Sequence, residues 1–247
     1  MNILVCISSV PDTTSKINFT ADSSALDKSG IQWIINPVDE VCLSKVVKLQ
    51  SSGAKVSVLC IGEGETEAVL RKCLAIGADE AIRVNLSPKD SYSTAKEIEQ
   101  VVKSGNYDVI LCGKESMDYN NGAVAGILAA LLGYPFVNSA IEIELQANEA
   151  KITREIDGGT ETVAVQLPAV IGGQKGLVSE KDIIIPNMRG IMSARTKPLQ
   201  VLEPTSNEVK ANTLSFEKTP ARANVKLIEA NNLDELVRLL KEEAKVI

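Results

Sequence analysis

Residues 107–133 read YDVILCGKESMDYNNGAVAGILAALLG. A short, continuous apolar run (VILC) comes first, and a second apolar segment follows after a polar loop, opening with small residues. The first pattern is typical of a strand buried on both faces, and the second of a helix packed against a sheet. The stretch therefore predicts a strand–loop–helix unit, which is the repeating element of parallel sheets covered by helices.

The same unit repeats upstream of this stretch. Apolar runs predict strands at 2–8, 55–62 and 80–84, and helical periodicity follows near Asp39, over 66–75 and over 93–103. We therefore expect an α/β protein with a Rossmann-like, doubly wound parallel sheet and helices on both faces. After Tyr134 the pattern changes to alternating apolar and polar residues, which predicts an antiparallel β-hairpin extension continuing to Gly173.

Regular patterns become sparse from Gly176 onwards. A passage rich in Pro, Ser, Thr and Asn spans 204–213, and a last amphipathic helix is predicted to begin near Asn232. We divide the chain into an α/β body (1–185) and a recognition loop with an extended C-terminal arm (186–247). The apolar residues of the last helix are expected to need a partner surface.

Composition excludes several classes of function. The 247 residues carry 26 cations and 32 anions, a net charge of −6, which argues against a nucleic-acid binder. The absence of histidine excludes Ser–His and Cys–His nucleophiles and His-containing zinc sites. No stretch suits membrane insertion or a signal peptide, so we expect a cytoplasmic protein. The five cysteines lie mostly in apolar runs, which predicts buried free thiols.

Ligands of open parallel sheets bind at the carboxyl ends of the strands. Those ends are predicted at 6–10, 36–39, 60–64 and 113–125. In the last of them, Gly122, Ala123 and Ala125 are small enough to let backbone N–H groups approach a phosphate at a helix N-terminus. Neither a dinucleotide fingerprint nor a Walker loop is present. The alternative is a plain strand-to-helix turn with a small-residue packing face.

A second candidate is TREIDGGTETV at 153–163. Arg154, Glu155 and Asp157 lie beside Gly158-Gly159. The alternative is a hairpin turn that carries surface charges, because Gly-Gly between alternating strands favours such a turn.

Several ordered motifs together resemble the β subunit of electron-transfer flavoprotein, in its bacterial form. They are LVCISSVPD, INPVDE, LRKCLAIGADEAIRV, GKESMD with its glycine-containing helix start, TREIDGGTETV, LPAVIGG and GIMSARTKP. The resemblance implies a heterodimer in which a larger α subunit holds the redox-active FAD, while this subunit buries a structural AMP. It also implies electron transfer from acyl-CoA dehydrogenases or related flavoenzymes, through a quinone-linked oxidoreductase, towards the quinone pool. This subunit is then an electron-carrier component without catalytic residues of its own. In an electron-bifurcating branch, a second FAD replaces AMP and NADH is used.

The resemblance also implies which residues surround the nucleotide. Cys6 and Ile61 match positions around the adenine. The family's NPxx loop matches Asn36, Pro37, Val38 and Asp39. The phosphate side matches Asp118 and the helix start that follows it: Asn121, Gly122, Ala123, Val124, Ala125 and Gly126. Familiar members carry Gln-Thr/Val-Gly where this chain has Ala123-Val124-Ala125, and an acidic cluster where it has Tyr119-Asn120-Asn121. AMP and FAD therefore both stay open as the ligand.

The segment DIIIPNMRGIMSARTKPL at 182–199 matches the loop that docks the dehydrogenase partner in the resembled family. The match places Met188 at the position of an apolar anchor. We expect the nearby cations to hold the loop against acidic groups of either partner; they are Arg189, Arg195 and Lys197. Pro186 would stiffen the approach and Gly190 would let the chain turn away. The alternative is that Met188 is a core residue at the edge of the body.

Two further classes compete with the electron carrier. One is a free-standing nucleotide-binding regulator that resembles universal stress proteins, which would not need an extended arm. The other is an ATP-using ligase or sulfurase of related fold. That reading requires a glycine in the loop after the first strand, and SSVPDTT has none.

Overall fold

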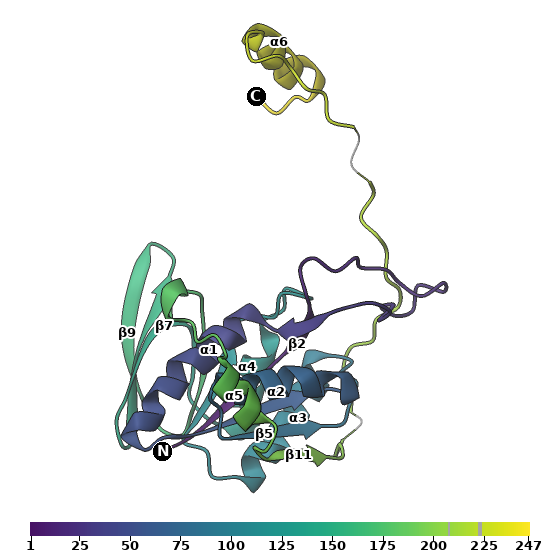
Figure 1. The fold of residues 1–247 in the computed structure, drawn as a ribbon. Coiled ribbons are helices and arrows are strands. Elements are labelled where there is room, and N and C mark those ends of the chain that lie inside the picture. The colour runs from purple at the N-terminus through teal and green to yellow at the C-terminus, as the bar shows by residue number, and fades with distance from the viewer. Residues whose placement is uncertain (207, 222–223) are drawn as a thin grey trace.

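The fold is built on a mostly parallel nine-stranded sheet in the order β11-β5-β4-β1-β6-β10-β7-β8-β9 (Figure 1). The computed structural model describes all residues except 207, 222 and 223. All neighbours from β11 to β7 pair in parallel, and β7, β8 and β9 form antiparallel pairs. The predicted parallel sheet and hairpin extension are thus confirmed. The strands are β1 (Asn2–Cys6), β4 (Lys55–Ile61), β5 (Glu80–Val84), β6 (Val109–Gly113), β7 (Phe136–Leu145), β8 (Glu149–Ile156), β9 (Gly159–Gln166), β10 (Ala169–Gly173) and β11 (Leu199–Leu202).

Helices cover both faces of the parallel part. One apolar core packs α1 (Pro37–Val47), α2 (Glu67–Ile76) and the end of α5 (Met188–Ala194) on one face, and a second core packs α3 (Ser91–Ser104) and α4 (Ala123–Leu132) on the other. The predicted bounds of α2, α3 and α4 agree with these to within about two residues, and α1, predicted to begin near Asp39, begins at Pro37. Short 3-10 turns span Lys48–Ser52, Gly64–Thr66 and Glu180–Asp182. Among the residues that the structure describes, no helix is long and apolar enough to cross a membrane.

One small sheet was not predicted, and the pairing of one strand in the large sheet was predicted wrongly. The apolar run before Asn36 forms β3 (Trp33–Ile35), which pairs antiparallel with β2 (Ser9–Pro11) in a separate small sheet. β10 was expected to continue the antiparallel extension, and this is wrong, because it lies parallel between β6 and β7. All five of its residues are buried, and a Cβ at Gly173 would lie 2.4 Å from Cys42 Sγ. Full burial on both faces is what a central parallel strand requires.

The segment after Gly176 is more regular than expected. α5 packs on α2, and β11 adds an edge strand to the parallel sheet by pairing with β5. The division at residue 185 stays a prediction, but residues 188–202 lie on the body and do not extend away from it. β11 was missed because LQVL is short and only half-buried, so it lacks the continuous apolar run of the inner strands.

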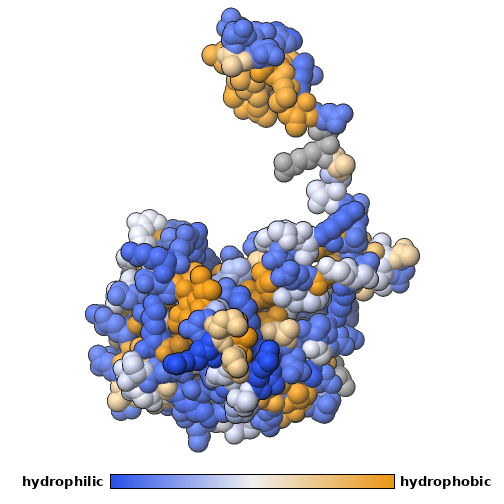
Figure 2. Space-filling model, in the orientation of Figure 1, coloured by the Kyte–Doolittle hydropathy of each residue, from blue (hydrophilic) through white to orange (hydrophobic). Residues whose placement is uncertain are grey.

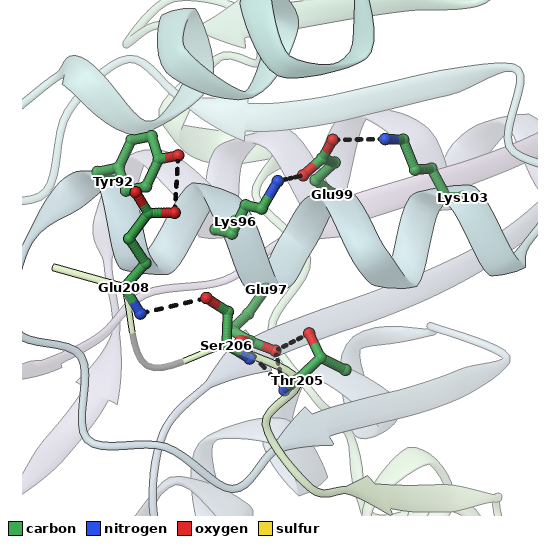
Figure 3. A network of polar contacts seen from close by, with 8 residues as sticks. All are labelled: Tyr92, Lys96, Glu97, Glu99, Lys103, Thr205, Ser206 and Glu208. Atoms are coloured by element: carbon green, nitrogen blue, oxygen red, sulfur yellow. Dashed lines mark hydrogen bonds and ion pairs between the residues drawn. The ribbon is translucent and has the colours of Figure 1, made fainter.

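The root of the C-terminal arm is held by a buried carboxylate of α3. Glu97 is 1% exposed, and its oxygens accept hydrogen bonds from the N–H groups of Thr205 and Ser206 and from the Thr205 hydroxyl, at 2.7–3.2 Å (Figure 3). Satisfaction by several donors makes burial of a carboxylate tolerable. The chain is thereby fixed where it leaves β11.

Further contacts hold the arm before it leaves the body. Asp90, the N-cap of α3, accepts hydrogen bonds from the N–H groups of Lys210 and Ala211 at 2.7 and 2.8 Å. Phe216 stacks on Phe19 with ring centroids 5.0 Å apart. Beyond these contacts the chain reaches α6 (Leu233–Arg238) and a π-helical turn (Leu239–Glu243), which stand apart from the body (Figure 1). The predicted start of this helix near Asn232 is confirmed.

Candidate functional site

The predicted ligand edge is assembled from three neighbouring strands. β1 lies between β4 and β6, so the ends that carry Cys6, Ile61 and Gly113 are adjacent. Cys6 and Ile61 also share one core cluster with Ala125 of α4. The fold therefore brings together residues that are more than a hundred positions apart, on the edge where open parallel sheets bind ligands.

Asn36 joins the loop after β1 to the loop after β6. Its side chain is 1% exposed; Nδ2 donates to the Glu115 carbonyl at 2.8 Å, and Oδ1 accepts from the Met117 N–H at 3.3 Å. Its own N–H donates to the Ser8 carbonyl at 2.9 Å. Asn36 therefore holds both loops in place through hydrogen bonds within the protein.

Asp39 makes a second, tighter connection between the same strand ends. It lies in the first turn of α1 and is 2% exposed; Oδ2 accepts from the Ser8 N–H at 2.7 Å and Oδ1 from the Gly113 N–H at 2.9 Å. Burial raises the pKa of Asp39 to about 7, although hydrogen bonds from Ser8, Asn36 and Gly113 act to lower it. A Cβ at Gly113 would lie 2.2 Å from Oδ1, so this approach requires glycine.

The phosphate-side candidate is the N-terminus of α4. Gly122 is the N-cap, and the preceding Asn121 accepts a hydrogen bond from the Ala123 N–H at 2.8 Å while donating to Ser91 Oγ at 2.9 Å. The N–H groups of Val124 and Ala125 have no intrahelical acceptor, because they belong to the first turn of an α-helix. This end of the helix thus offers amide donors and the positive end of the helix dipole to an anion.

The loop before α4 is folded upon itself. Ser116 N–H donates to the Asn121 carbonyl at 3.1 Å, and Asn120 adopts a left-handed φ of 50°. Asp118 is exposed and accepts from the Tyr119 N–H at 2.9 Å. A Cβ at Gly126 would lie 3.5 Å from the Phe136 ring, so that position packs towards β7. Asp118 thus has a hydrogen-bond donor, and Gly126 a packing neighbour, within the protein itself.

The predicted edge segments 6–10 and 113–125 contain the residues that hold this edge through their backbones, but sequence reasoning did not single them out; they are Ser8, Gly113 and Glu115. Gly113 could have been found as a glycine that ends a buried strand, whereas Ser8 and Glu115 act only through main-chain atoms and leave no signal in the sequence. Two cavities, of about 350 Å³ beside Tyr107 and about 630 Å³ between α2 and α5, are lined by none of the predicted nucleotide residues.

The cysteines are core residues, as predicted. All five are free and buried, and burial raises the pKa of Cys60 to about 12. Cys42 donates to the Cys112 carbonyl at a sulfur–oxygen distance of 3.6 Å. The Cys60 thiol therefore stays protonated and unreactive at neutral pH.

The TREIDGG segment is a hairpin with surface charges. Arg154 pairs with Glu161 across β8 and β9, Glu155 accepts from Gln174, and Gly158 turns the chain with a φ of 83°. The structural alternative accounts for each of these residues.

Met188 is an exposed residue, so its alternative placement in the core is wrong. It begins α5 with 73% of its surface exposed, and the exposed Arg189 follows it. Gly190 does not provide a turn: it lies within the helix, where a Cβ would be 2.5 Å from the Ala75 carbonyl oxygen. Of the nearby cations, Lys197 donates to the carbonyls of Leu74 and Ala78 and so holds the segment to the body. The expectation that it faces a partner is wrong.

Replacing Asp39 with Asn tests the buried carboxyl group. The amide oxygen can accept from only one of the two N–H donors, so Asp39→Asn should lower the free energy of unfolding by about 1–3 kcal/mol. A folded-state pKa of about 7, above the unfolded value of about 3.9, means that wild-type stability from this group falls as pH rises from 4 to 7. The loss of unfolding free energy in Asp39→Asn, relative to wild type, should therefore be larger at pH 5 than at pH 8, as measured by denaturant unfolding.

The control is Asp157→Asn at the exposed hairpin turn, which removes a carboxylate without touching this network. A loss of unfolding free energy in Asp39→Asn that is identical at both pH values would contradict the raised pKa of Asp39.

Comparison with known proteins places this site in a family. The electron transfer flavoprotein domain matches residues 24–207. A Bacillus subtilis (strain 168) protein named electron transfer flavoprotein subunit beta is 32% identical over 262 residues, with 100% of both chains covered. A Syntrophomonas wolfei protein of the same name is 34% identical over 226 residues, covering 90% of this chain and 88% of the relative. A rice protein, from Oryza sativa subsp. japonica, named as a mitochondrial subunit beta, is 29% identical over 256 residues and covers 100% of both chains. With its sheet, its α4 terminus and these end-to-end matches, the chain belongs to the electron transfer flavoprotein β subunit family.

Proposed function

We propose that this chain is the β subunit of a heterodimeric electron-transfer flavoprotein that carries electrons from acyl-CoA dehydrogenases, or related flavoenzymes, towards a quinone-linked oxidoreductase and the quinone pool. The observation that carries the proposal is the match to β subunits over the full length of both chains. The redox-active FAD is held mainly by the α subunit. This chain contributes a structural nucleotide site and docking surfaces, acts in the cytoplasm, and supplies no catalytic residue of its own.

The nucleotide that we propose for this chain is AMP. Support comes from the α4 N-terminus, where the Val124 and Ala125 amides provide donors suited to a single phosphate. Cys6 and Ile61, at the ends of β1 and β4, provide an apolar surface for the base. Asn36 and Asp39 fix the two loops between which the nucleotide would lie.

Ala123→Leu tests the phosphate side. Ala123 is exposed, so a larger side chain can be placed there without crowding the core, but it would obstruct the approach of a ligand to the first turn. Ala125 is 3% exposed and is less suitable, because a large residue would overpack the core. We expect denatured heterodimer to release one AMP per dimer for wild type and at least about tenfold less for the variant. The measurement is chromatography and mass spectrometry of the released small molecules.

Ala130→Leu, an exposed position near the other end of α4, is the matched control and should retain the nucleotide. Release of two FAD and no AMP from wild type would instead assign the chain to the bifurcating branch. Retention of AMP by Ala123→Leu would show that the N-terminus of α4 does not bind the phosphate.

The α subunit is proposed to cover α6. Leu233, Leu236 and Val237 are 63%, 38% and 52% exposed, and an apolar patch is visible on this helix in Figure 2. Contiguous exposed apolar surface of this kind marks interaction sites. An unpartnered helix at the end of an extended arm gains its stability from a surface on another chain.

Replacement of Leu233, Leu236 and Val237 by Ser together should weaken assembly with the α subunit by on the order of a hundredfold, because several apolar anchors are lost. The melting temperature of the body should be unchanged, since α6 stands apart from it. Analytical ultracentrifugation of the mixed subunits measures the change, with Lys241→Ala on the same helical region as control. Full-strength assembly of the triple variant would refute this role.

Met188 is proposed as the anchor for the dehydrogenase. Truncating an interface anchor commonly costs about 2 kcal/mol, or about thirtyfold in affinity. Met188→Ala should therefore raise the KM of the heterodimer for the dehydrogenase about thirtyfold. FAD content, AMP content and melting temperature should stay unchanged, because 73% of this residue is exposed. Steady-state electron-transfer assays give the KM.

Met192→Ala provides the comparison, since Met192 is 65% exposed on the same helix. A larger effect there than at Met188 would move the anchor by one helical turn, and a normal KM for both variants would exclude α5 from docking.

A further inference from the structure

The helices α2 and α5 cap each other at their C-terminal ends. Lys197 Nζ donates to the carbonyls of Leu74 and Ala78, at 3.1 and 2.6 Å, where α2 ends. Arg71 Nη1 of α2 donates to the carbonyls of Ala194 and Lys197, both at 3.0 Å, where α5 ends. The last carbonyls of a helix lack intrahelical donors and carry partial negative charge, so a cation there satisfies and stabilises them. Neither helix has a basic residue in its last turn. Arg71 of α2 supplies a cation to the end of α5, and Lys197, three residues after α5, supplies one to the end of α2.

The backbones of the two helices are also in direct contact. A Cβ at Gly190 would lie only 2.5 Å from the Ala75 carbonyl oxygen, and Ala194 is 3% exposed. Lys197 is half-buried at this junction, and burial lowers its pKa. A partly desolvated ammonium group bound to two carbonyls is held in one place and is not a mobile surface charge.

The N-terminal residue of α5 is exposed to solvent. Met188 is the first residue of α5, and Asn187 caps it by accepting from the Gly190 N–H at 2.9 Å. Seven residues are too few for an isolated helix to be stable in water, so the existence of α5 depends on its packing against α2. In Figure 2, dark blue and pale orange surfaces lie side by side over this helix.

We propose that Lys197 and Arg71 are positioning residues for partner docking: by locking α5 onto α2, they present Met188 in one fixed place. The inference rests on the proposed role of Met188 as anchor. Pre-ordering a binding element reduces the entropy that is lost on association, so a rigid α5 strengthens docking without adding a contact. Neither cation needs to touch the partner, because both are bound to carbonyls of this chain.

The test uses the full-length heterodimer with Lys197→Met, which keeps most of the apolar stem and removes the ammonium group. Lys197→Arg keeps a cation that can still donate, and Lys175→Met removes an exposed lysine that is paired with Glu180 at 3.2 Å, with 83% of its side chain exposed. Amide hydrogen exchange over 188–194 should become on the order of tenfold faster in Lys197→Met, as expected for the loss of a charge-assisted bond. It should stay near the wild-type rate in the other two variants.

A double-mutant cycle then links this rigidity to docking. The KM of the heterodimer for an acyl-CoA dehydrogenase is measured for Lys197→Met, Met188→Ala and the double variant. We expect Lys197→Met to raise KM about fivefold in the wild-type background and less than about twofold when Met188 is already Ala, with kcat unchanged.

Unchanged exchange over 188–194 in Lys197→Met overturns the inference, and so does an equal rise in KM in both backgrounds, since Lys197 would then act independently of Met188. A normal KM for Met188→Ala alone is a different failure. It would remove the proposed anchor itself, and the positioning role with it.

Discussion

The two hydrogen bonds accepted by Asp39 are the contact on which the ligand edge depends. β1 and β6 are neighbours in the sheet, but the chain diverges where they end: one strand continues into β2 and the other into the loop before α4. The carboxylate of Asp39 accepts hydrogen bonds from the Ser8 N–H, just after β1, and from the Gly113 N–H, at the end of β6, and so holds the two strand ends together. Asn36 extends the same connection to Glu115 and Met117. Removing this carboxyl group from water is costly, and its raised pKa reflects that cost. The edge is therefore shaped from within the protein before any ligand arrives.

Much of the body could be predicted because its strands are short, continuous apolar runs and its helices carry periodic apolar residues. Val109–Gly113 and the α4 segment are examples, and their bounds agree closely with the structure. β10 could not be placed, because the sequence AVIGG predicts a buried strand but contains no information about which neighbours it pairs with. Ser8 and Glu115 escaped prediction for a related reason: they act through main-chain atoms that every residue possesses. The helical state of α5 was also missed, since seven residues with a central glycine carry little helical signal and tertiary contacts with α2 decide the outcome.

Two carboxylates, at the N-cap and within α3, both accept hydrogen bonds from N–H groups of the arm. Asp90 caps its own helix and also receives the Lys210 and Ala211 amides, whereas Glu97 is buried among donors from Thr205 and Ser206. Burial acts to raise the pKa of Asp90, but the hydrogen bonds from Ser93, Ala211 and Lys210 outweigh it and lower the pKa to about 2. Asp90 thus remains ionised at neutral pH. Both carboxyl groups hold a segment that carries few apolar residues of its own. Figure 3 shows Glu97 of α3 bound to Thr205 and Ser206 of the arm.

The contacts of Phe216 with Phe19 and of Lys218 with Asn18 set a limit on the geometry of any assembly that uses α6. Among the residues that the structure describes, the last hydrogen bond from the arm to the body is the one from Lys218 to Asn18, and α6 begins at Leu233. A fully extended chain spans at most about 3.3–3.6 Å per residue, so the fourteen intervening residues cover no more than about 50 Å. Were the chain free from residue 207 onwards, the limit would be about 90 Å by the same geometry. A receptor surface for α6 must therefore lie within a sphere of about 50 Å around Lys218, which is a distance restraint for docking calculations and for the choice of cross-linker lengths.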